Sequence, residues 1–348
     1  MNMKKISIIV PCHNCSDSIE RTWKSIKDQS MDPASLECIF VDDASDDEGK
    51  TWQKLTEIEK EAPECVAIIR LESNLRQGGA RNVALNYVSG EYLLFLDADD
   101  TLREQTCELL YDKAKEHDCD LIQFKHRHIK EREDLKGVPK TGEITGEETL
   151  YDLEENEETR KQFLTLSIGS AGCTNKFYKT ALVKQTGSLY AENVIYEEPK
   201  FVYPMFLYAK RVLMLDEDLY EYHWREDSTM TSQLGKRLLD HPRVQLELLE
   251  DLMAREEEFK AYFSEIEYYF VKSFYVETLV FAWTNHGIIP EDFMSHMQTI
   301  VKSFFPGVQN NKYIRGDREF SEIVGSINRK FKDQEELLMY EKHVAELI

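Results

Sequence analysis

The sequence is short of positive charge, of long apolar runs and of paired cysteines. Its 43 lysines and arginines stand against 65 acidic residues, and the formal net charge of the 348-residue chain is −22. Broad contact with nucleic acid or with anionic lipid is therefore excluded as the main activity, because both depend on clustered positive charge. An anionic substrate would need local basic side chains.

Long apolar runs are absent as well. No stretch approaches the roughly twenty apolar residues of a membrane-spanning helix, and the opening MNMKKISIIVPCHN is too short in apolar residues for a secretory signal. Residues 266–283 are rich in aromatic and aliphatic side chains, but Lys272 and Glu277 interrupt them, which favours a buried helix or a subunit interface. We expect a cytoplasmic protein, with peripheral contact at the inner face of the plasma membrane left open.

The seven cysteines are an odd number scattered along the chain, and they do not resemble a disulfide framework. Cys12 and Cys15 form a Cys-x-x-Cys directly after a predicted strand, which is where thioredoxin-type redox motifs lie. The pattern is short and common, so structural thiols are favoured. A zinc site would need a second close pair of ligands, and the sequence has no other Cys-x-x-Cys and no His-x-x-x-His.

In the first half of the chain, short β-rich runs alternate with helix-length segments. This alternation is typical of an α/β fold, in which a mostly parallel sheet is covered by helices on both faces. The runs that predict strands are Lys5–Pro11, Leu36–Asp42, Cys65–Leu71, Glu91–Asp97 and Asp120–His126.

Helix starts are predicted where a capping residue is followed three residues later by glutamate. The pairs are Ser45 with Glu48, Thr101 with Glu104 and Asp17 with Glu20. Another helix is predicted in residues 197–211, and the acidic stretch Glu143–Glu158 predicts a solvated loop or exposed helix. After about Gly235, apolar residues recur at three- and four-residue spacings, which predicts a mainly helical C-terminal region.

Acidic residues follow two of the predicted strands. In EYLLFLDADDT, helix capping would account for Asp100 and Thr101. Asp97 and Asp99 remain, and they would lie at the sheet edge where open parallel sheets bind ligands. Two alternate carboxylates at that edge suit a divalent cation such as Mg²⁺ or Mn²⁺, which commonly bridges carboxylate to phosphate.

The second acidic pair, Asp42 and Asp43, can accept hydrogen bonds from a base or from a ribose hydroxyl. Donors for phosphate are present in RLESNLRQGGARN, which supplies Arg70, Arg76 and Arg81 around two glycines. That segment is neither a P-loop nor a dinucleotide-binding fingerprint. The residues alone therefore indicate a metal-dependent nucleotide or phosphate ligand, with unrelated surface acids as the alternative.

Four segments together resemble the inverting glycosyltransferase family 2, whose fold is the nucleotide-diphospho-sugar transferase type A. They are SIIVPCHNCSDSIERTWKSIKDQS, FVDDASDD, NLRQGGARNVALNYVSGEYLLFLDADD, which ends in a D-x-D motif, and NVIYEEPKF. The resemblance covers about Lys4 to Ser232. It implies a catalytic domain over residues 1–234, with a nucleotide-binding half at about 1–126 and an acceptor half at about 127–234, followed by a helical region at 235–348.

The same resemblance implies roles for individual residues. Asp97 would approach the ribose and the metal-bound phosphate, and Asp99 would ligate the metal, Mn²⁺ or Mg²⁺. The donor would be a nucleotide sugar, with UDP-sugars favoured by the habit of the family. The residues implied to bind the donor are Pro11, Asn14, Asp42, Asp43, Arg76, Arg81 and Asp97.

Glu198 stands where the family has its general base, which takes the proton of the acceptor hydroxyl as the nucleoside diphosphate leaves from the opposite face. The sequence departs from the family pattern here, because glutamate replaces aspartate and Pro199 follows. Glu197 is a second candidate for the same role. The alternative is that both glutamates simply begin the helix predicted in residues 197–211.

Two further segments resemble stretches that border the family's site. YEYHWREDSTMTS carries His223 and Arg225, which the resemblance places near the phosphates or the metal. CTNKFYK carries Asn175 and Lys176, which it places near the acceptor. A packed histidine and a surface turn are the alternatives.

The sequence as a whole therefore predicts a metal-dependent inverting glycosyltransferase that acts on a glycan or lipid-linked acceptor in surface polysaccharide biosynthesis. Three alternatives are weighed: a non-catalytic sugar-nucleotide or glycan-binding protein, a nucleotidyltransferase and a thioredoxin-like protein. A nucleotidyltransferase would need a glycine-rich basic loop after the first strand, and PCHNCSDS has neither glycine nor a basic residue. The C-terminal helices are candidates for homo-oligomer formation, for covering the acceptor or for membrane contact.

Overall fold

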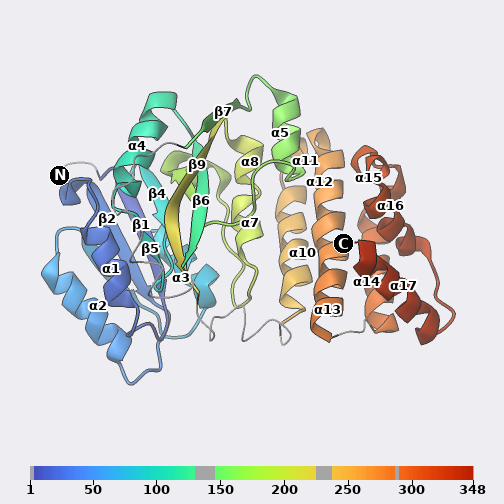
Figure 1. The fold of residues 1–348 in the computed structure, drawn as a ribbon, viewed down its shortest axis with the longest axis horizontal. Coiled ribbons are helices and arrows are strands. Elements are labelled where there is room, and N and C mark those ends of the chain that lie inside the picture. The colour runs from blue at the N-terminus through green and yellow to red at the C-terminus, as the bar shows by residue number, and fades with distance from the viewer. Residues whose placement is uncertain (1–3, 130–145, 225–236, 287–289, 348) are drawn as a thin grey trace. The chain divides into compact units, whose positions relative to one another are not determined.

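The computed structural model describes residues 4–129, 146–224, 237–286 and 290–347. The chain divides into two compact units. The first comprises Met1–Arg160 and Gly169–Ser228, and the second comprises Lys161–Ile168 and Thr229–Ile348. Figure 1 shows that the first unit holds the sheet and that the second is helical.

The first unit is built on one sheet with the strand order β3-β2-β1-β4-β8-β6-β9-β5, in which β7 also pairs with β9. The strands are β1 (Ile6–Cys12), β2 (Leu36–Asp42), β3 (Val66–Arg70), β4 (Tyr92–Phe95), β5 (Thr101–Leu102), β6 (Leu121–Ile129), β7 (Glu148–Asp152), β8 (Lys176–Lys179) and β9 (Arg211–His223). All five strands predicted from the sequence are present. The acidic stretch was expected to be a loop or helix, and that expectation is wrong for β7, which pairs with β9.

Strand direction brings several loops to one edge of the sheet. Strands β1, β2, β3 and β4 are mutually parallel, so they all end at the same edge. Strand β8 runs antiparallel to both β4 and β6, and β9 runs parallel to β6. The first residue of β8 therefore lies at the edge where β4, β6 and β9 end, and this edge receives the polar residues described below.

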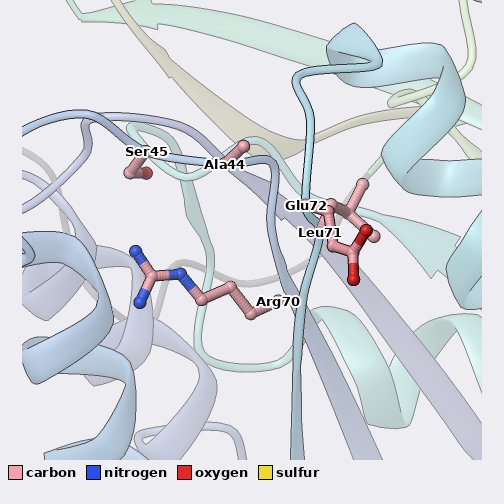
Figure 2. A pocket seen from close by; sticks show the side chains of 5 residues that line it. All are labelled: Ala44, Ser45, Arg70, Leu71 and Glu72. Carbon is pink, nitrogen blue, oxygen red and sulfur yellow. The ribbon is translucent and has the colours of Figure 1, made fainter.

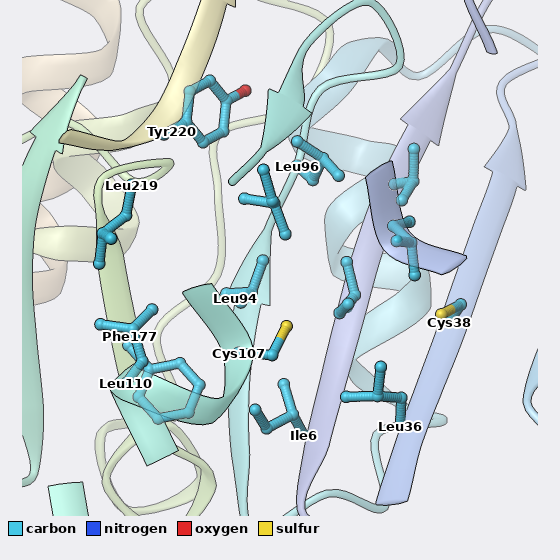
Figure 3. Close-up of a cluster of buried hydrophobic side chains, with 14 of the residues drawn as sticks. Ile6, Leu36, Cys38, Leu94, Leu96, Cys107, Leu110, Phe177, Leu219 and Tyr220 are labelled. Atoms are coloured by element: carbon cyan, nitrogen blue, oxygen red, sulfur yellow. The ribbon is translucent and has the colours of Figure 1, made fainter. Parts of the chain in front are cut away.

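Helices cover both faces of the sheet in the first unit (Figure 1). They are α1 (Ile19–Lys27), α2 (Lys50–Glu61), α3 (Arg76–Leu85), α4 (Thr106–His117), α6 (Thr180–Thr186), α7 (Glu198–Val202) and α8 (Met205–Tyr208), with α5 (Glu157–Leu164) at the division between the units. On one face, alternate strand residues such as Ile6, Leu36 and Leu94 pack against α1, α2 and α4 in a continuous apolar cluster (Figure 3). Successive strand side chains point to opposite faces, which explains this alternation.

The second face of the sheet carries an aromatic cluster. The Phe95 ring from the end of β4 makes edge contacts with Tyr178, Tyr190 and Phe201 at centroid distances of 5.4–5.7 Å. Tyr190 and Phe201 stack on each other at 4.3 Å. The segment that leads into α7 is thereby fixed against the sheet, close to the edge where β4 ends.

The predicted capping boxes are wrong at all three positions. α1 begins after Ser18, α2 begins after Gly49 and α4 begins at Thr106. Tertiary partners occupy the side chains instead: the Ser45 hydroxyl accepts from the Asn14 amide, and Thr101 lies in β5 with its hydroxyl donating to Glu221. At Ser45 and Thr101, contacts with residues distant in sequence replace the local helix caps that the sequence predicted.

The second unit confirms the helical periodicity of the C-terminal third. It contains α10 (Asp240–Met253), α11 (Glu256–Ala261), α12 (Phe263–Phe270), a π-helical segment (Val271–Glu277), α13 (Thr278–His286), α14 (Glu291–Phe304), α15 (Lys312–Gly316), α16 (Arg318–Gly325) and α17 (Gln334–Leu347). Ile266, Phe270 and Phe274 are buried, as expected for a core helix. Among the described residues, no helix combines the length and the hydropathy that a bilayer span requires.

Leu94 on β4 is fully buried in the apolar cluster, whereas Leu189 is half exposed. We expect Leu94→Ala to lower the free energy of unfolding of the first unit by about 2–5 kcal/mol, because it leaves a cavity. Leu189→Ala removes the same atoms and should change it by less than about 0.5 kcal/mol. Urea titration followed by fluorescence of Trp23 and Trp52 measures both variants, and equal losses would contradict the assignment of the core.

Candidate functional site

The charged side chains that could bind a ligand or take part in a reaction lie at the edge where the parallel strands end. Asp97 and Asp99 follow β4, Asp42 and Asp43 lie at the end of β2, and Lys176 begins β8. The α/β topology places these ends side by side, since β2, β1, β4 and β8 are consecutive neighbours in the sheet. Open parallel sheets bind ligands at this edge.

A buried arginine joins two of the acidic segments. Arg81 of α3 is only 1% exposed, and its guanidinium donates through Nη1 to Oε1 of Glu197 at 2.7 Å and through Nη2 to Oδ1 of Asp97 at 2.8 Å. The guanidinium also lies 5.2 Å from the ring centre of Tyr190. The resemblance implied that Arg81 lies along the nucleotide, and in the structure both of its terminal nitrogens donate to protein carboxylates.

Burial and charge act against each other in this trio. Burial raises the pKa of Asp97 and that of Glu197, and the Arg81 guanidinium only partly offsets the effect. Burial also disfavours the charge on Arg81, but Asp97 and Glu197 are among the groups that hold its pKa well above the usual range. Asp99 and Glu198 add further negative charge near Asp97. The site therefore carries more carboxylate charge than this guanidinium can balance.

Gly78 allows α3 to approach the segment that carries the glutamates. A Cβ atom at this position would lie 2.4 Å from the carbonyl oxygen of Ala191 and 3.0 Å from Cγ of Glu197. Gly78 therefore packs closely against the segment that contains Ala191 and Glu197. Asn82 strengthens the junction, because its side chain accepts from the Tyr190 amide and donates to the Tyr190 carbonyl.

Glu198 has a different environment from Glu197, although the two are adjacent. Glu197 is 5% exposed and paired with Arg81, whereas Glu198 is partly exposed at the start of α7. Oε1 of Glu198 accepts the backbone N–H of Cys173 at 2.7 Å. A turn formed by residues 170–175 therefore holds the Glu198 carboxylate at the sheet edge.

Lys176 is fully buried directly after that turn. Its ammonium donates to Oγ of Ser170, to the carbonyl oxygen of Gly172 and to Oδ1 of Asn175 at 2.5–3.1 Å. Burial lowers the pKa of Lys176 to about 7, although the nearby Glu198 charge acts in the opposite direction. The resemblance predicted that Lys176 and Asn175 lie near the acceptor. In the structure the Lys176 ammonium donates to the Asn175 side chain.

His126 is a site residue that sequence reasoning missed. Its Nε2 lies 3.0 Å from the Thr174 hydroxyl, its ring packs on Tyr220, and burial lowers its pKa to about 4. Its position near the end of the predicted strand Asp120–His126 was the available signal, because that end had to meet the other strand ends.

Asp100 faces inward and does not cap a helix. It accepts from the Tyr220 hydroxyl at 2.6 Å and from the His223 amide at 2.8 Å, and burial together with Asp97 and Asp99 raises its pKa to about 8. His223 is buried, with Nε2 2.9 Å from the Thr101 hydroxyl, and burial lowers its pKa to about 4. Arg225, the other residue expected near the phosphates, lies outside the described residues.

A hollow is lined by Ala44, Ser45, Arg70, Leu71 and Glu72 (Figure 2), and Asp42 contacts two of these residues, Ser45 and Arg70. Asp42 is fully buried; Oδ1 accepts the Ser45 amide, and Oδ2 lies 3.3 Å from Nε of Arg70 in an ion pair without hydrogen-bond geometry. The Arg70 guanidinium also lies over the Trp52 ring at 5.4 Å. A buried carboxylate oxygen beside an open hollow is suited to accept from a ligand.

Asp43 has a local task. Its Oδ1 accepts the Leu75 amide at 2.7 Å just before α3, and burial raises its pKa. Of the two aspartates that the sequence left open for contact with the base, Asp42 is the one that adjoins the hollow. Asp43 instead fixes the start of α3.

Several turns at this edge are held in the left-handed backbone region. Asn14, Ala44, Arg76 and Tyr196 have φ values of 50°, 51°, 63° and 66°. The Asn14 side chain exchanges hydrogen bonds with Asp46 and so ties the turn after β1 to the turn after β2. Non-glycine residues in this region carry backbone strain, which clusters at functional sites.

The strand that leads to Asn14 is buried. Pro11 and Cys12 lie within β1, where they pair with Val41 and Asp42 of β2. Cys12 and Cys15 are free thiols, and burial raises the pKa of Cys12 well above its usual range. A redox-active cysteine needs a lowered pKa, so the thioredoxin-like interpretation is not supported.

The residues at the end of β4 fit a divalent cation that takes most of its ligands from elsewhere. Asp97 has one oxygen on Arg81, and both Asp97 and Asp99 are partly exposed at the edge. Within the described ranges there is no cluster of three or more histidine, cysteine, aspartate or glutamate side chains with metal-binding geometry. A cation here would need phosphate or water oxygens to complete its shell, as Mg²⁺ commonly does.

Comparison with known proteins identifies the family to which this chain belongs. Residues 7–187, just over half of the chain, match the family model described as Glycosyl transferase family 2. The chain therefore belongs to this family. The match contains the strand ends, the aspartates and the turn at residues 170–175, and it stops before Glu197 and Glu198.

Two of the curated relatives come from Staphylococcus aureus. The chain is 30% identical over 236 residues to the poly(ribitol-phosphate) beta-N-acetylglucosaminyltransferase TarS of Staphylococcus aureus, covering 66% of this chain and 37% of TarS. It is 36% identical over 121 residues to the S. aureus transferase TarP, covering 34% of this chain and 36% of TarP. The chain thus spans about a third of the length of these relatives.

Solved structures share the fold over nearly the whole chain. The crystal structure of S. aureus TarS 1-349 in complex with UDP-GlcNAc has a TM-score of 0.58 and 22% sequence identity, covering 93% of this chain and 90% of that one. A second TarS crystal structure has a TM-score of 0.67 and 20% identity, covering 97% of this chain and 55% of that one. The α/β fold with a helical C-terminal region, predicted from the sequence, is confirmed.

Gly78→Ala tests the close approach of α3. The added methyl group would lie 2.4 Å from a backbone oxygen, so we expect a loss of about 1–3 kcal/mol in unfolding free energy. Gly325→Ala is the control, because nothing lies within 4 Å of its Cβ and the residue is helical. Thermal unfolding of both variants decides the matter, and a tolerated Gly78→Ala would disprove the close packing.

Buried Lys176 should also give a pH signature. Its folded pKa of about 7 lies below the ordinary value of 10.5, so between these values the unfolded chain binds more protons. The contribution of this group to stability is therefore fully present above about pH 10.5 and is lost as pH falls through 7. The difference in unfolding free energy between wild type and Lys176→Met, measured by urea titration from pH 6 to pH 10, should grow with pH. A constant difference would mean that the ammonium titrates normally.

Proposed function

We propose that this chain is a metal-dependent, inverting glycosyltransferase that moves a hexose or N-acetylhexosamine from a UDP donor to a hydroxyl of a surface polymer. The observation that carries the proposal is the divided arrangement of Glu197 and Glu198. One glutamate is paired with Arg81, and the other accepts a hydrogen bond from the Cys173 amide at the sheet edge. A donor site and a separate proton acceptor thereby share one sheet edge.

The donor would lie along the strand ends. The nucleobase would occupy the hollow beside Asp42, which is lined by Arg70, whose guanidinium lies over the Trp52 ring. Asn14 and Pro11 would shape the hollow through the turn that they support. Asp97 and Asp99 would hold Mn²⁺ or Mg²⁺ together with the diphosphate. When bound, the metal would stabilise negative charge on the leaving diphosphate. Arg76 remains a candidate for contact with the nucleotide.

In this proposal Arg81 is a positioning residue. Its guanidinium holds Asp97 on the donor side and Glu197 on the acceptor side, so it sets the distance between the two parts of the reaction. Glu197 is then unsuited to act as the base, because its carboxylate is paired and nearly fully buried. Glu198 takes the proton of the acceptor hydroxyl, whose oxygen attacks the anomeric carbon while the bond from that carbon to the diphosphate oxygen breaks.

The relatives support the substrate class. TarS and TarP are named for the transfer of N-acetylglucosamine to poly(ribitol phosphate), and one TarS structure contains UDP-GlcNAc. Because this chain spans about a third of those proteins, an acceptor of the same kind, a glycan or polyol-phosphate polymer, is proposed on the shared catalytic part only.

The test is release of UDP from UDP-glucose, UDP-galactose and UDP-GlcNAc, with Mn²⁺ or Mg²⁺ and with poly(ribitol phosphate) or water as acceptor. We expect Asp99→Ala to lose metal-dependent turnover, and Glu198→Gln to lower kcat by about 10²–10⁴-fold without weakening UDP binding. The charge-matched control is Glu192→Gln, which lies on the same segment with its carboxylate on Asn82.

Three outcomes would contradict the proposal. UDP binding without turnover of any donor would favour a sugar-nucleotide-binding protein. Wild-type rates in Asp99→Ala would contradict the proposed role of Asp99 as a ligand of a metal that the reaction requires. Wild-type rates in Glu198→Gln would contradict the proposed role of Glu198 as the general base.

A further inference from the structure

Lys176 carries a buried charge that the proposed reaction does not use. Its ammonium has three N–H donors, and three oxygens accept them: Oγ of Ser170 at 3.0 Å, the Gly172 carbonyl at 2.5 Å and Oδ1 of Asn175 at 3.1 Å. No donor is left for a phosphate or an acceptor sugar. The ammonium therefore acts on the turn of residues 170–175.

That turn is the support of Glu198. Cys173 lies between Gly172 and Asn175, two of the residues that bind the ammonium, and its N–H donates to Oε1 of Glu198 at 2.7 Å. The direction of the Cys173 N–H follows from the path of the turn. The path in turn depends on the ammonium that gathers its oxygens.

The other supports of the turn are neutral. The Tyr178 hydroxyl donates to the Cys173 carbonyl at 3.1 Å, and Oε1 of Gln123 accepts the Ser170 amide at 3.1 Å. The Thr174 hydroxyl lies 3.0 Å from His126, whose lowered pKa keeps its ring neutral at pH 7. Lys176 is the basic group that donates to the turn.

A buried lysine at this position would be an unfavourable choice for folding free energy if its only role were to fill space. Burying an ammonium is unfavourable even with good partners, and an apolar side chain of similar volume would commonly be at least as stable. The negative charge of Glu198 acts on Lys176 in the favourable direction. The charge and the carboxylate are thus coupled through the turn and through space.

We propose that Lys176 is a positioning residue for sugar transfer: it fixes residues 170–175 so that the Cys173 amide aims the Glu198 carboxylate at the acceptor hydroxyl. The inference rests on the proposed role of Glu198 as the base. It replaces the expectation that Lys176 contacts phosphate or acceptor itself.

The first measurement separates positioning from donor binding. Because a displacement of about 1 Å can cost roughly 10²-fold in rate, we expect Lys176→Met to lower kcat by about that factor. The Kd for UDP, measured by calorimetry, should stay at the wild-type value. Lys179→Met is the matched control, since Lys179 ends the same strand, pairs with Asp118 and should keep full activity.

The second measurement is a double-mutant cycle with Glu198→Gln, using the UDP-sugar that wild type turns over fastest. If Lys176 acts through Glu198, Lys176→Met should lower the residual rate of Glu198→Gln by less than about twofold. A purely structural role would give the same roughly 10²-fold loss in both backgrounds. Asn175→Ala, which removes one oxygen from the ammonium, repeats the cycle if Lys176→Met does not fold.

The outcomes are distinct. Independent, multiplying losses or a weakened UDP affinity would overturn the role of Lys176, and so would a wild-type kcat in Lys176→Met. In each of these cases a large loss in Glu198→Gln alone would leave the proposed function standing. A wild-type rate in Glu198→Gln would instead overturn the proposed base, and the inference about Lys176 with it.

Discussion

The arrangement of the site depends on the Arg81 guanidinium, which lies between Asp97 and Glu197. Glu197 is 116 residues away from Arg81 in sequence, so this contact joins the helix after the third strand to the segment before α7. Gly78 and Asn82 bring the same two segments together, and the aromatic rings of Tyr190 and Phe95 enclose the guanidinium. A buried ion pair of this kind is a weak source of stability, but it strongly restricts geometry.

Adjacent glutamates have different chemistry because their partners differ. Glu197 is buried and paired with a guanidinium that it shares with Asp97, while Glu198 accepts the backbone N–H of Cys173 and stays partly exposed. The start of α7 turns the two side chains in different directions, with Tyr196 held at positive φ just before them. Environment, and not residue type, makes Glu197 a structural partner of Arg81 and leaves Glu198 available for the proposed role of general base.

Much of the fold and part of the site follow from the sequence. β-rich runs located the five leading strands, and the surplus acids at Asp97, Asp99 and Asp42 do lie at one sheet edge. Capping signals at Ser45 and Thr101 failed because partners distant in sequence compete for those hydroxyls. The inward direction of Arg81 and Lys176 was also beyond prediction, since a basic side chain reads as a ligand contact until burial shows which oxygens surround it.

The left-handed turns at Asn14, Ala44, Arg76 and Tyr196 connect the stability of the fold with the preorganisation of the proposed site. Each L-residue held in that region costs roughly 1 kcal/mol or more of folding free energy. The folded chain thus holds these turns in a strained conformation in advance, so a ligand bound there would not bear the entropy of ordering them. Ala44→Gly would relieve this strain and raise the stability of the fold, but it would also increase the conformational freedom of the turn. A more stable protein would then be expected to bind the proposed nucleotide donor more weakly.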